Sequence, residues 1–296
     1  MSDTFQLILL VLCIIIICAV LLLNRGPKYQ IPKVIWLYWD EEKKPPLIEA
    51  IHKYNLPKME GWEVRFLNKE SIHKYVDAQE YPANLADQKI QHQSDWYRLY
   101  LLSKYGGCWI DASIILNDPE ALDSIWDRST EMRADITIFG TSSYNEDEGN
   151  IYKKFSHSSG MDIPLVIDNW FIMAPLHSSI ASKWFEEFNT AMQQGLLSYK
   201  RMCVEEGVDI SAIYFTDEDD TYLTMHMCIQ KIMQKDLTDL PPILVLDSRD
   251  SMFKIHEECE WKQECIEETV LEEESRELPY IKLMSTNRTD ALMAYF

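Results

Sequence analysis

The amino-acid sequence predicts an α/β domain that follows a single N-terminal transmembrane helix. Segments typical of buried strands alternate with helical segments from residue 31 onward, and no internal repeat or interdomain linker interrupts them. The chain has 296 residues, of which 47% are hydrophobic, so it can bury a substantial core. About 270 residues remain after the apolar start, and one large α/β domain is the simplest account of that length.

The apolar start is long enough to cross a membrane. Phe5 to Leu23 is apolar except for Gln6, and this stretch as a helix covers about 28 Å, close to the hydrocarbon thickness of a bilayer. A cleaved signal peptide would have a basic tail, a shorter core and a small-residue cleavage site, whereas the tail here is MSDT. We therefore expect an N-terminal tail at 1–4, an uncleaved anchor at 5–24, a linker at 25–30 and the domain at 31–296.

Two observations disagree about the side of the membrane on which the domain lies. Arg25, Lys28 and Lys33 follow the anchor and Asp3 precedes it, so the positive-inside rule slightly favours the cytosol. A sequon for N-glycosylation at residues 287–289 would be used only in the lumen. Its position near the C-terminus decides little, and the orientation stays open.

Charge and cysteine content limit the classes of function. The formal net charge is −20, and such a surface repels phosphate backbones, so we expect no nucleic-acid partner. Ten glutamates lie between residues 257 and 277, which is typical of a solvated helix or insertion. Five cysteines follow the anchor without any CxxC pair, a pattern of neither a zinc site nor a clear disulfide framework. Cys259 and Cys265 would suit a disulfide in an oxidising compartment, although their spacing does not require one.

The first elements of the domain predict a parallel strand–helix–strand unit. Val34 to Trp39 is a continuous β-branched and aromatic run, residues 47–54 have helical character, and residues 62–67 alternate as a strand does. Such units are right-handed, and ligands of parallel sheets bind outside the carboxyl ends of the strands. Asp40 and Asn68 are therefore expected near a site.

Later segments continue the alternation of strands and helices. We expect strands at 136–139, 165–173 and 243–246, and helices at 222–235 and from Ser178 or Ser179 onward. The second of these helices has one apolar face. The residues of this face are Ile180, Trp184, Phe185, Phe188 and Met192.

Residues 94–102 combine a buried helix with two charges. The chain lacks GxGxxG, P-loop, GxSxG and HExxH motifs, which removes the common nucleotide, hydrolase and zinc-protease signatures. Ser94 is expected to be the N-cap of a helix with Asp95 in its first turn. Asp95 and Arg98 share a face of this helix, which is otherwise apolar nearly all round. They form either an internal ion pair or, with a polar ligand that completes their hydrogen bonds, part of a site.

A carboxylate follows directly after this helix and a pair of glycines. Gly106 is expected to end the helix in a left-handed conformation, and Gly107 allows close approach of neighbouring backbone. Residues 108–110 then enter the core as a strand, and Asp111 places a carboxylate at its end. A divalent cation or a hydrogen-bond network would make this carboxylate tolerable. Asp111 and Ser113 would together offer oxygens to a metal that carries a diphosphate, and a structural role is equally compatible.

These residues resemble a known family. SDWYRLYLLSKYGGCWIDAS at 94–113 resembles the SDxxRxxxLxxYGGxWxDA(S/T) signature of capsular-polysaccharide-synthesis-type glycosyltransferases. These are similar to the DXD-containing mannosyltransferase family and, more distantly, to clostridial toxin glucosyltransferases. IPKVIWLYW at 31–39 resembles the IPKxIW start of that group, and DNWFIMAP at 168–175 resembles its central NWF segment. The likeness extends over about residues 31–290, and only the 94–113 block is highly specific.

The resemblance implies a reaction and a fold. It implies a GT-A fold, a Rossmann-like domain that binds nucleotide sugars, and transfer of a hexose from a UDP- or GDP-linked donor to a glycan, glycolipid or glycoprotein acceptor. It further implies Mn²⁺ or Mg²⁺ as cofactor and retention of anomeric configuration, which needs no single strong catalytic base. Golgi-type members of such families hold the catalytic domain in the lumen. This is the opposite side to the cytosol, which the charges flanking the anchor slightly favour.

The resemblance also assigns catalytic and metal-binding roles. Asp111 matches the first aspartate of the DXD motif, and Ser113 occupies its second acidic position, which leaves one fewer anionic metal ligand. Asp95 matches an aspartate that binds donor sugar or ribose hydroxyls, and Arg98 matches an arginine close to sugar and phosphate. We therefore expect Asp111, Asp95 and Arg98 to be catalytic, and Asp111 with Ser113 to bind the metal.

Six other residues are candidates for substrate binding. Tyr38 and Trp39 end the first strand, where aromatic rings would flank the base, although core packing also explains them. Asp168 and Asn169 would contact the acceptor or donor sugar, although strand-edge packing is an equal alternative. Lys282 resembles a late family segment near the diphosphate, with a surface lysine as the alternative. The set is Tyr38, Trp39, Gly107, Asp168, Asn169 and Lys282.

Three other functions compete with transfer. A sugar- or nucleotide-sugar-binding membrane protein without catalysis stays open because Ser113 replaces a carboxylate. A glycoside hydrolase with Asp95 and Asp111 as its paired carboxylates would cleave glycosides without any nucleotide. A structural membrane protein would leave Asp111 and the Asp95–Arg98 pair unexplained.

Overall fold

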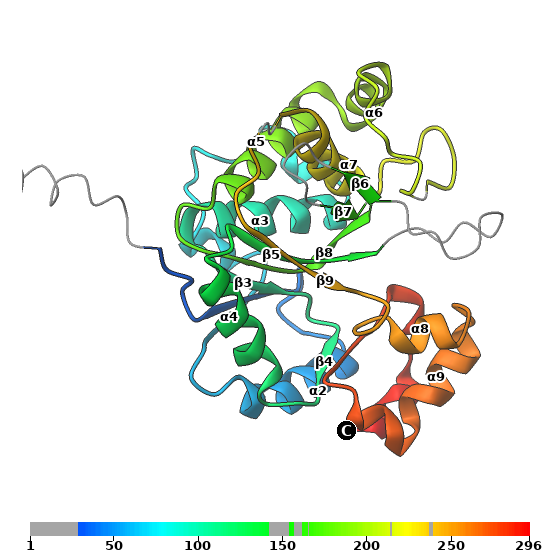
Figure 1. Ribbon diagram of the computed structural model, residues 1–296. Helices are drawn as coiled ribbons and strands as arrows, with labels where there is room; N and C mark the ends of the chain where they lie inside the picture. Colours follow the sequence, from blue (N-terminus) through cyan, green and yellow to red (C-terminus); the bar gives the residue numbers. More distant parts are fainter. Residues whose placement is uncertain (1–28, 142–153, 157–161, 165, 214, 237–238) are drawn as a thin grey trace, which may run out of the picture. The chain divides into compact units, whose positions relative to one another are not determined.

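A six-stranded mixed sheet forms the centre of the domain. The strand order is β2-β1-β3-β8-β5-β9 (Figure 1). β1 pairs in parallel with β2 and β3, and β5 with β9, whereas β8 runs antiparallel to β3 and β5. The predicted α/β class is confirmed. The strands are β1 Val34–Tyr38, β2 Glu63–Leu67, β3 Gly107–Ile110, β5 Ile136–Thr141, β8 Val166–Ala174 and β9 Ile243–Asp247.

The computed structural model describes residues 29–141, 154–156, 162–164, 166–213, 215–236 and 239–296. Ile31–Phe296 forms one compact unit. The predicted anchor at 5–24 lies outside the described residues and stays a prediction. Within the described ranges, no helix combines the length and the apolar character that a membrane span requires.

The predicted strand–helix–strand unit at the start of the domain is confirmed. β1, α2 (Pro46–Asn55) and β2 follow one another, and the two strands pair in parallel with Ile35 opposite Val64. The two polar residues expected near a site have local partners. The Asp40 carboxylate accepts the Tyr38 hydroxyl at 3.0 Å, and the Asn68 side chain accepts backbone N–H groups of the turn that follows β2.

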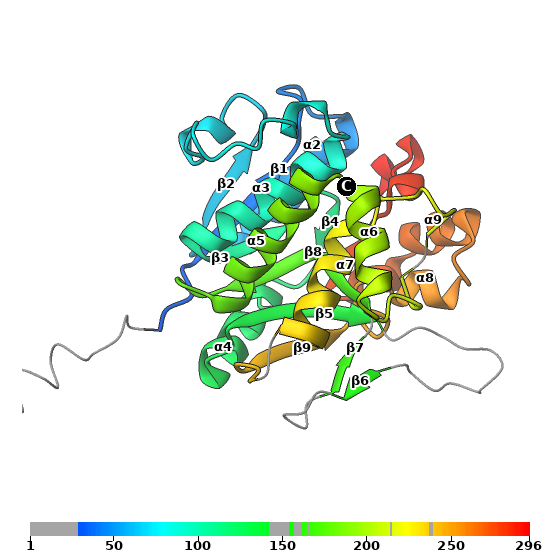
Figure 2. The same cartoon turned by 90° about the horizontal axis from the view of Figure 1, so that it is seen from above.

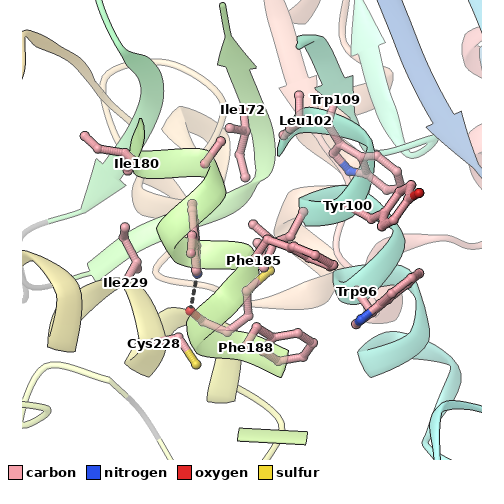
Figure 3. Packing of buried hydrophobic residues seen from close by; sticks show 14 of the residues in the cluster. Trp96, Tyr100, Leu102, Trp109, Ile172, Ile180, Phe185, Phe188, Cys228 and Ile229 are labelled. Carbon is pink, nitrogen blue, oxygen red and sulfur yellow. Dashed lines mark hydrogen bonds between the residues drawn. The ribbon is translucent and has the colours of Figure 1, made fainter. Parts of the chain in front are cut away.

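Helices cover both faces of the sheet. α3 (Ile90–Tyr105), α5 (Ser179–Gln194) and α7 (Thr224–Lys231) lie on one face, and α2 and α4 (Ala121–Met132) lie on the other (Figure 1). α3 and α5 run side by side (Figure 2). Between them pack Trp96, Tyr100 and Phe185 (Figure 3).

The apolar face predicted for α5 is buried in full. All five residues, from Ile180 to Met192, belong to the core, and the Ser178 hydroxyl accepts the Ala181 N–H at 3.0 Å as the N-cap. The helix predicted at 222–235 is α7, which continues into a π-helical segment at Ile232–Asp236.

The remaining elements are short. The acidic segment at 257–277 contains all of α9, and its glutamates are exposed except for the half-buried Glu267, as predicted for a solvated segment. Cys259 and Cys265 in this segment form a disulfide. The other helices are α6 Leu196–Glu205, α8 Lys254–Glu258 and α9 Gln263–Leu271; the other strands are β4 Ile114–Leu116, β6 Lys154–Ser156, β7 Asp162–Pro164 and β10 Tyr280–Lys282; and the 3₁₀ helices are Leu56–Met59, Ile72–Lys74, Leu85–Asp87, Glu273–Glu277, Ser285–Asn287 and Asp290–Tyr295.

Candidate active site

The helix that carries Asp95 and Arg98 starts earlier than predicted. α3 begins at Ile90, so Ser94 is not its N-cap and Asp95 lies in the second turn. Residues 90–93 extend the helix because they contain no glycine or proline that would end it. The interaction with the helix dipole therefore does not account for Asp95, since that effect fades beyond the first turn. The side-chain partners of Asp95, which are Arg98 and Asn169, account for its position in the buried helix.

Two glycines turn the chain sharply from α3 into the sheet. Gly106 has φ +61° and its N–H donates to the Leu102 carbonyl at 3.0 Å. Gly107 has φ +93°, and a Cβ at this position would lie 2.7 Å from the Val34 carbonyl oxygen of β1. Gly106 ends the helix with a positive φ as predicted, but its ψ of −156° differs from that of the predicted left-handed cap. Gly107 is buried inside the sheet, where its backbone approaches β1 closely as predicted.

Asp111 stands directly after β3 with every side-chain oxygen in use. Oδ1 accepts from Arg98 Nη2 at 3.0 Å and from Trp109 Nε1 at 3.0 Å. Oδ2 accepts from Lys282 Nζ at 2.8 Å. The backbone N–H of Asp111 donates to the Trp170 carbonyl at 2.8 Å, which holds the residue at this strand end. The side chain is 27% exposed, so the carboxylate reaches the surface.

Arg98 bridges the two carboxylates. Its Nη1 donates to Asp95 Oδ1 at 2.9 Å, while Nη2 donates to Asp111. Asp95 Oδ1 also accepts from Asn169 Nδ2 at 3.0 Å. The guanidinium lies 4.9 Å from the centre of the Trp109 ring. We call Asp95, Arg98, Asp111, Asn169 and Lys282 the charged cluster.

Lys282 enters the cluster through a strand pair far apart in the sequence. β10 pairs antiparallel with β4, and Lys282 is opposite Ile114. This register places its Nζ 2.9 Å from Ser113 Oγ as well as 2.8 Å from Asp111 Oδ2. Lys282 is 5% exposed, so it is not a surface lysine.

A bulge in β8 brings Asn169 into the cluster. Between the pairs Ile138–Ile172 and Gly140–Ile167, four residues of β8 lie opposite one residue of β5, and bulges of this kind re-aim side chains. Asn169 points to Asp95 on α3. Successive strand side chains alternate between faces, so Asp168 points away from Asn169, and its carboxylate accepts the hydroxyl of Ser248. Sequence reasoning treated the two as one pair, and the structure separates them.

The aromatic pair at the end of β1 divides in the same way. Tyr38 is buried, donates to Asp40 and lies 5.1 Å from the Tyr97 ring, so it packs in the core. Trp39 is half-buried, and the Arg288 guanidinium lies 5.5 Å from the centre of its ring. Trp39 is thus the member of the pair that is open to a ligand.

Burial and charge set the protonation of the cluster. Burial raises the pKa of Asp95 to about 7, against the opposing effect of the Arg98 guanidinium. Burial would also raise the pKa of Asp111, but the nearby Lys282 and Arg98 outweigh it and hold this pKa below its usual value. Burial lowers the pKa of Lys282, while Asp111 opposes that shift. Asp111 is therefore ionised at neutral pH, and Asp95 titrates there.

Two buried histidines beside the cluster carry no charge at neutral pH. His92 Nδ1 lies 3.9 Å from Asp95 Oδ2, and burial lowers the pKa of His92 to about 4. Burial likewise lowers the pKa of His226 to about 3, with a further contribution from Arg98. Neither histidine adds positive charge to the cluster.

Sequence reasoning missed Arg288 and Met225. The Arg288 guanidinium lies 5.5 Å from the centre of the Trp39 ring, and burial lowers the pKa of Arg288 while the Asp111 carboxylate opposes that shift. The Met225 sulfur lies 3.5 Å from Arg98 Nη1 and 3.4 Å from Asn169 Nδ2. The available signal for Arg288 was its position six residues after Lys282, in a stretch after Glu277 that contains two basic residues and one acidic residue. No sequence signal pointed to Met225.

The predicted metal ligands do not fit a divalent cation as they are arranged. Asp111 Oδ2 and Ser113 Oγ both accept from the Lys282 ammonium. Asp111 Oδ1 accepts two further N–H groups. Among the residues that the structure describes, no group of three or more His, Cys, Asp or Glu side chains is placed to hold a metal. A divalent cation at this position would have to displace Lys282, and the Mn²⁺ or Mg²⁺ site stays a prediction.

Comparison with known proteins gives one family and several structures. The family model described as "Capsular polysaccharide synthesis protein" matches residues 23–202. No curated protein matches. Similar structures are a glycosyltransferase involved in the glycosylation of the major capsid of PBCV-1 (9% identity, 89% of this chain and 97% of that chain, TM-score 0.43), the PaToxG glycosyltransferase (12% identity, 69% and 89%, TM-score 0.34) and the galactosyltransferase LgtC with donor and acceptor sugar analogues (11% identity, 73% and 74%, TM-score 0.31).

Proposed function

This chain belongs to the capsular polysaccharide synthesis protein family, and from that premise we propose that it transfers a hexose from a nucleotide-diphosphate sugar to a glycan or glycoconjugate acceptor. The family that residues 94–113 resemble is thereby confirmed, and membership supports the predicted enzyme class, a glycosyltransferase. The relation to DXD-containing mannosyltransferases stays a prediction.

One observation carries the proposal. Arg98 bridges Asp95 and Asp111 at the carboxyl end of a central strand, and Lys282 completes the same network. A departing nucleoside diphosphate develops negative charge, and cations fixed in advance at that position stabilise the transition state. The carboxylates hold the cations in place, and Asp111, whose side chain is 27% exposed, connects the cluster to the surface. This arrangement suits a diphosphate better than a neutral glycoside.

The transfer itself exchanges one bond for another. The bond between the anomeric carbon and the diphosphate oxygen breaks, and its electron pair leaves with the nucleoside diphosphate. The acceptor hydroxyl oxygen forms the new bond to the anomeric carbon, and its proton passes to the departing diphosphate. We propose retention of configuration from the family resemblance. Both carboxylates of the cluster already accept N–H groups of Arg98, so neither stands free as a strong base.

The finer features of the donor site are also proposals. We propose a GT-A fold, supported by a mixed sheet in which Asp111 follows the central strand β3. Trp39 with Arg288 beside it is the candidate contact for the base and the phosphates. We propose a UDP- or GDP-linked sugar as the donor.

We propose an anchor at 5–24 and a domain in an oxidising compartment. The disulfide between Cys259 and Cys265 supports an oxidising compartment, because disulfides persist in such compartments and are rare in the cytosol. Asn287 of the sequon is 3% exposed and its side chain bonds to His256 at 3.0 Å, so the folded domain does not present it for glycosylation. Alkylation without reductant should leave both cysteines unmodified, and modification of both would exclude this compartment.

A donor screen tests the function. The full-length chain in detergent would be incubated with nucleotide sugars, with and without Mn²⁺, and released nucleoside diphosphate measured. We expect release from at least one donor, and a loss of at least about 100-fold in the Asp111→Ala variant. Asp123→Ala, which removes a half-exposed carboxylate paired with Lys33, is the matched control. A wild-type chain that turns over no donor, or that matches Asp111→Ala, would refute the proposal, and cleavage of glycosides without nucleotide would indicate a hydrolase.

A further inference from the structure

Resting on the proposed transferase function, we propose that the Lys282 ammonium takes the place of the divalent cation at the donor diphosphate, so that transfer requires no metal. Its Nζ lies 2.8 Å from Asp111 Oδ2 and 2.9 Å from Ser113 Oγ. These two atoms are the ones that the DXD-like pattern assigned to a metal. The ammonium therefore already occupies the position between them.

The backbone fixes Lys282 at this position. Its N–H donates to the Met252 carbonyl at 3.1 Å, and the N–H of Leu283 donates to the Ser113 carbonyl at 3.1 Å. Together with the pairing of β10 and β4, these bonds fix the backbone from which the Lys282 side chain reaches Asp111 and Ser113. A divalent cation bound to the same oxygens would meet the ammonium at contact distance, where like charges repel strongly in a buried site.

The charge of the ligands suits an ammonium better than a divalent cation. Ser113 contributes a neutral hydroxyl, so Asp111 is the one carboxylate at this position, and it balances one ammonium. An ammonium has three N–H donors. Two are directed to Asp111 and Ser113, and among the described residues no third acceptor is found, so one N–H remains for an oxygen of the ligand.

Together with Arg288, the charged cluster has an excess of cations, although the chain is strongly acidic. Arg98, Lys282 and Arg288 supply three cations, against the two carboxylates of Asp95 and Asp111. In a chain of net charge −20, a local excess of cations is the electrostatic requirement of an anion site. The exposed part of Asp111 marks the side from which the diphosphate reaches the cluster.

The test compares donor turnover by the full-length chain in chelator with turnover in Mn²⁺ or Mg²⁺. We expect the wild-type rate to survive chelation, and Lys282→Met to lower the rate at least about 100-fold in either condition. Lys231→Met is the matched control, since Lys231 is also mostly buried and pairs with Glu187 at 2.9 Å away from the cluster. Melting temperatures of both variants would show whether they fold.

Two results would overturn the proposal while the transferase function stands. The first is a wild-type rate that chelation abolishes and Mn²⁺ or Mg²⁺ restores. The second needs no activity: electron paramagnetic resonance that detects one tightly bound Mn²⁺ per wild-type chain, lost in Asp111→Ala. If no nucleotide sugar is turned over in any condition, the transferase function itself fails, and this result is distinct from both.

Discussion

At the scale of the residue, the site is a balance of buried charges. Arg98 would be costly inside the domain without a partner, and it has two carboxylates, Asp95 and Asp111. The pair Asp95–Arg98 was predictable, because residues three apart on a helix share a face. The contact with Asp111 was not, because the angle between α3 and β3 depends on the glycine turn.

The pKa of Asp95 makes a prediction for stability. Burial raises this pKa to about 7, whereas an unfolded aspartate titrates near 3.9. The folded chain thus binds the proton more tightly, and the stabilisation that results is complete below about pH 4 and is lost as the pH rises through about 7. In Asp95→Asn no such titration occurs. The melting temperature of the wild type minus that of the variant should therefore decrease between about pH 4 and about pH 7 in calorimetric scans; a constant difference would contradict the raised pKa.

At the scale of the element, three backbone features place the side chains of the charged cluster. The Gly106–Gly107 turn directs β3 between β1 and β8, the β8 bulge aims Asn169 at α3, and the pairing of β4 with β10 delivers Lys282. Only the first was visible in the sequence, since two consecutive glycines after an apolar helix have a clear conformational meaning. A bulge and a pairing over this sequence separation depend on tertiary contacts that no local pattern encodes.

The close approach at Gly107 is testable by a matched pair of substitutions. Gly61→Ala and Gly107→Ala both place a side chain at positive φ, +84° and +93°, which costs about 1–2 kcal/mol. Only at Gly107 does the new Cβ meet a backbone oxygen, at 2.7 Å from Val34, while nothing lies within 4 Å at Gly61. We expect Gly107→Ala to lower the free energy of unfolding by about 1–3 kcal/mol more than Gly61→Ala. If thermal unfolding shows that both variants lose the same free energy of unfolding, β1 and β3 can move apart without an energetic cost.

At the scale of the whole molecule, the domain combines an acidic surface with one cationic cluster. Composition predicted the acidity, and the strand–helix alternation predicted the α/β class, because both are properties of local sequence. The antiparallel β8 in the middle of the sheet was not predicted, since strand direction depends on how connections cross the sheet. The site depends on that strand, because both Asn169 and the Trp170 carbonyl come from it.

The central claim is that the charged cluster binds the diphosphate of a nucleotide donor. The most direct test is calorimetric titration of the full-length chain with UDP and GDP in the presence of Mn²⁺, for the wild type, Arg98→Met and Arg65→Met. Arg65 is the matched control, because its guanidinium lies 4.7 Å from the Trp36 ring, much as Arg98 lies 4.9 Å from Trp109. We predict that at least one nucleotide binds the wild type and Arg65→Met with equal affinity and Arg98→Met at least about tenfold more weakly. Absence of binding to the wild type, or equal affinity in Arg98→Met, would contradict the assignment of the donor site.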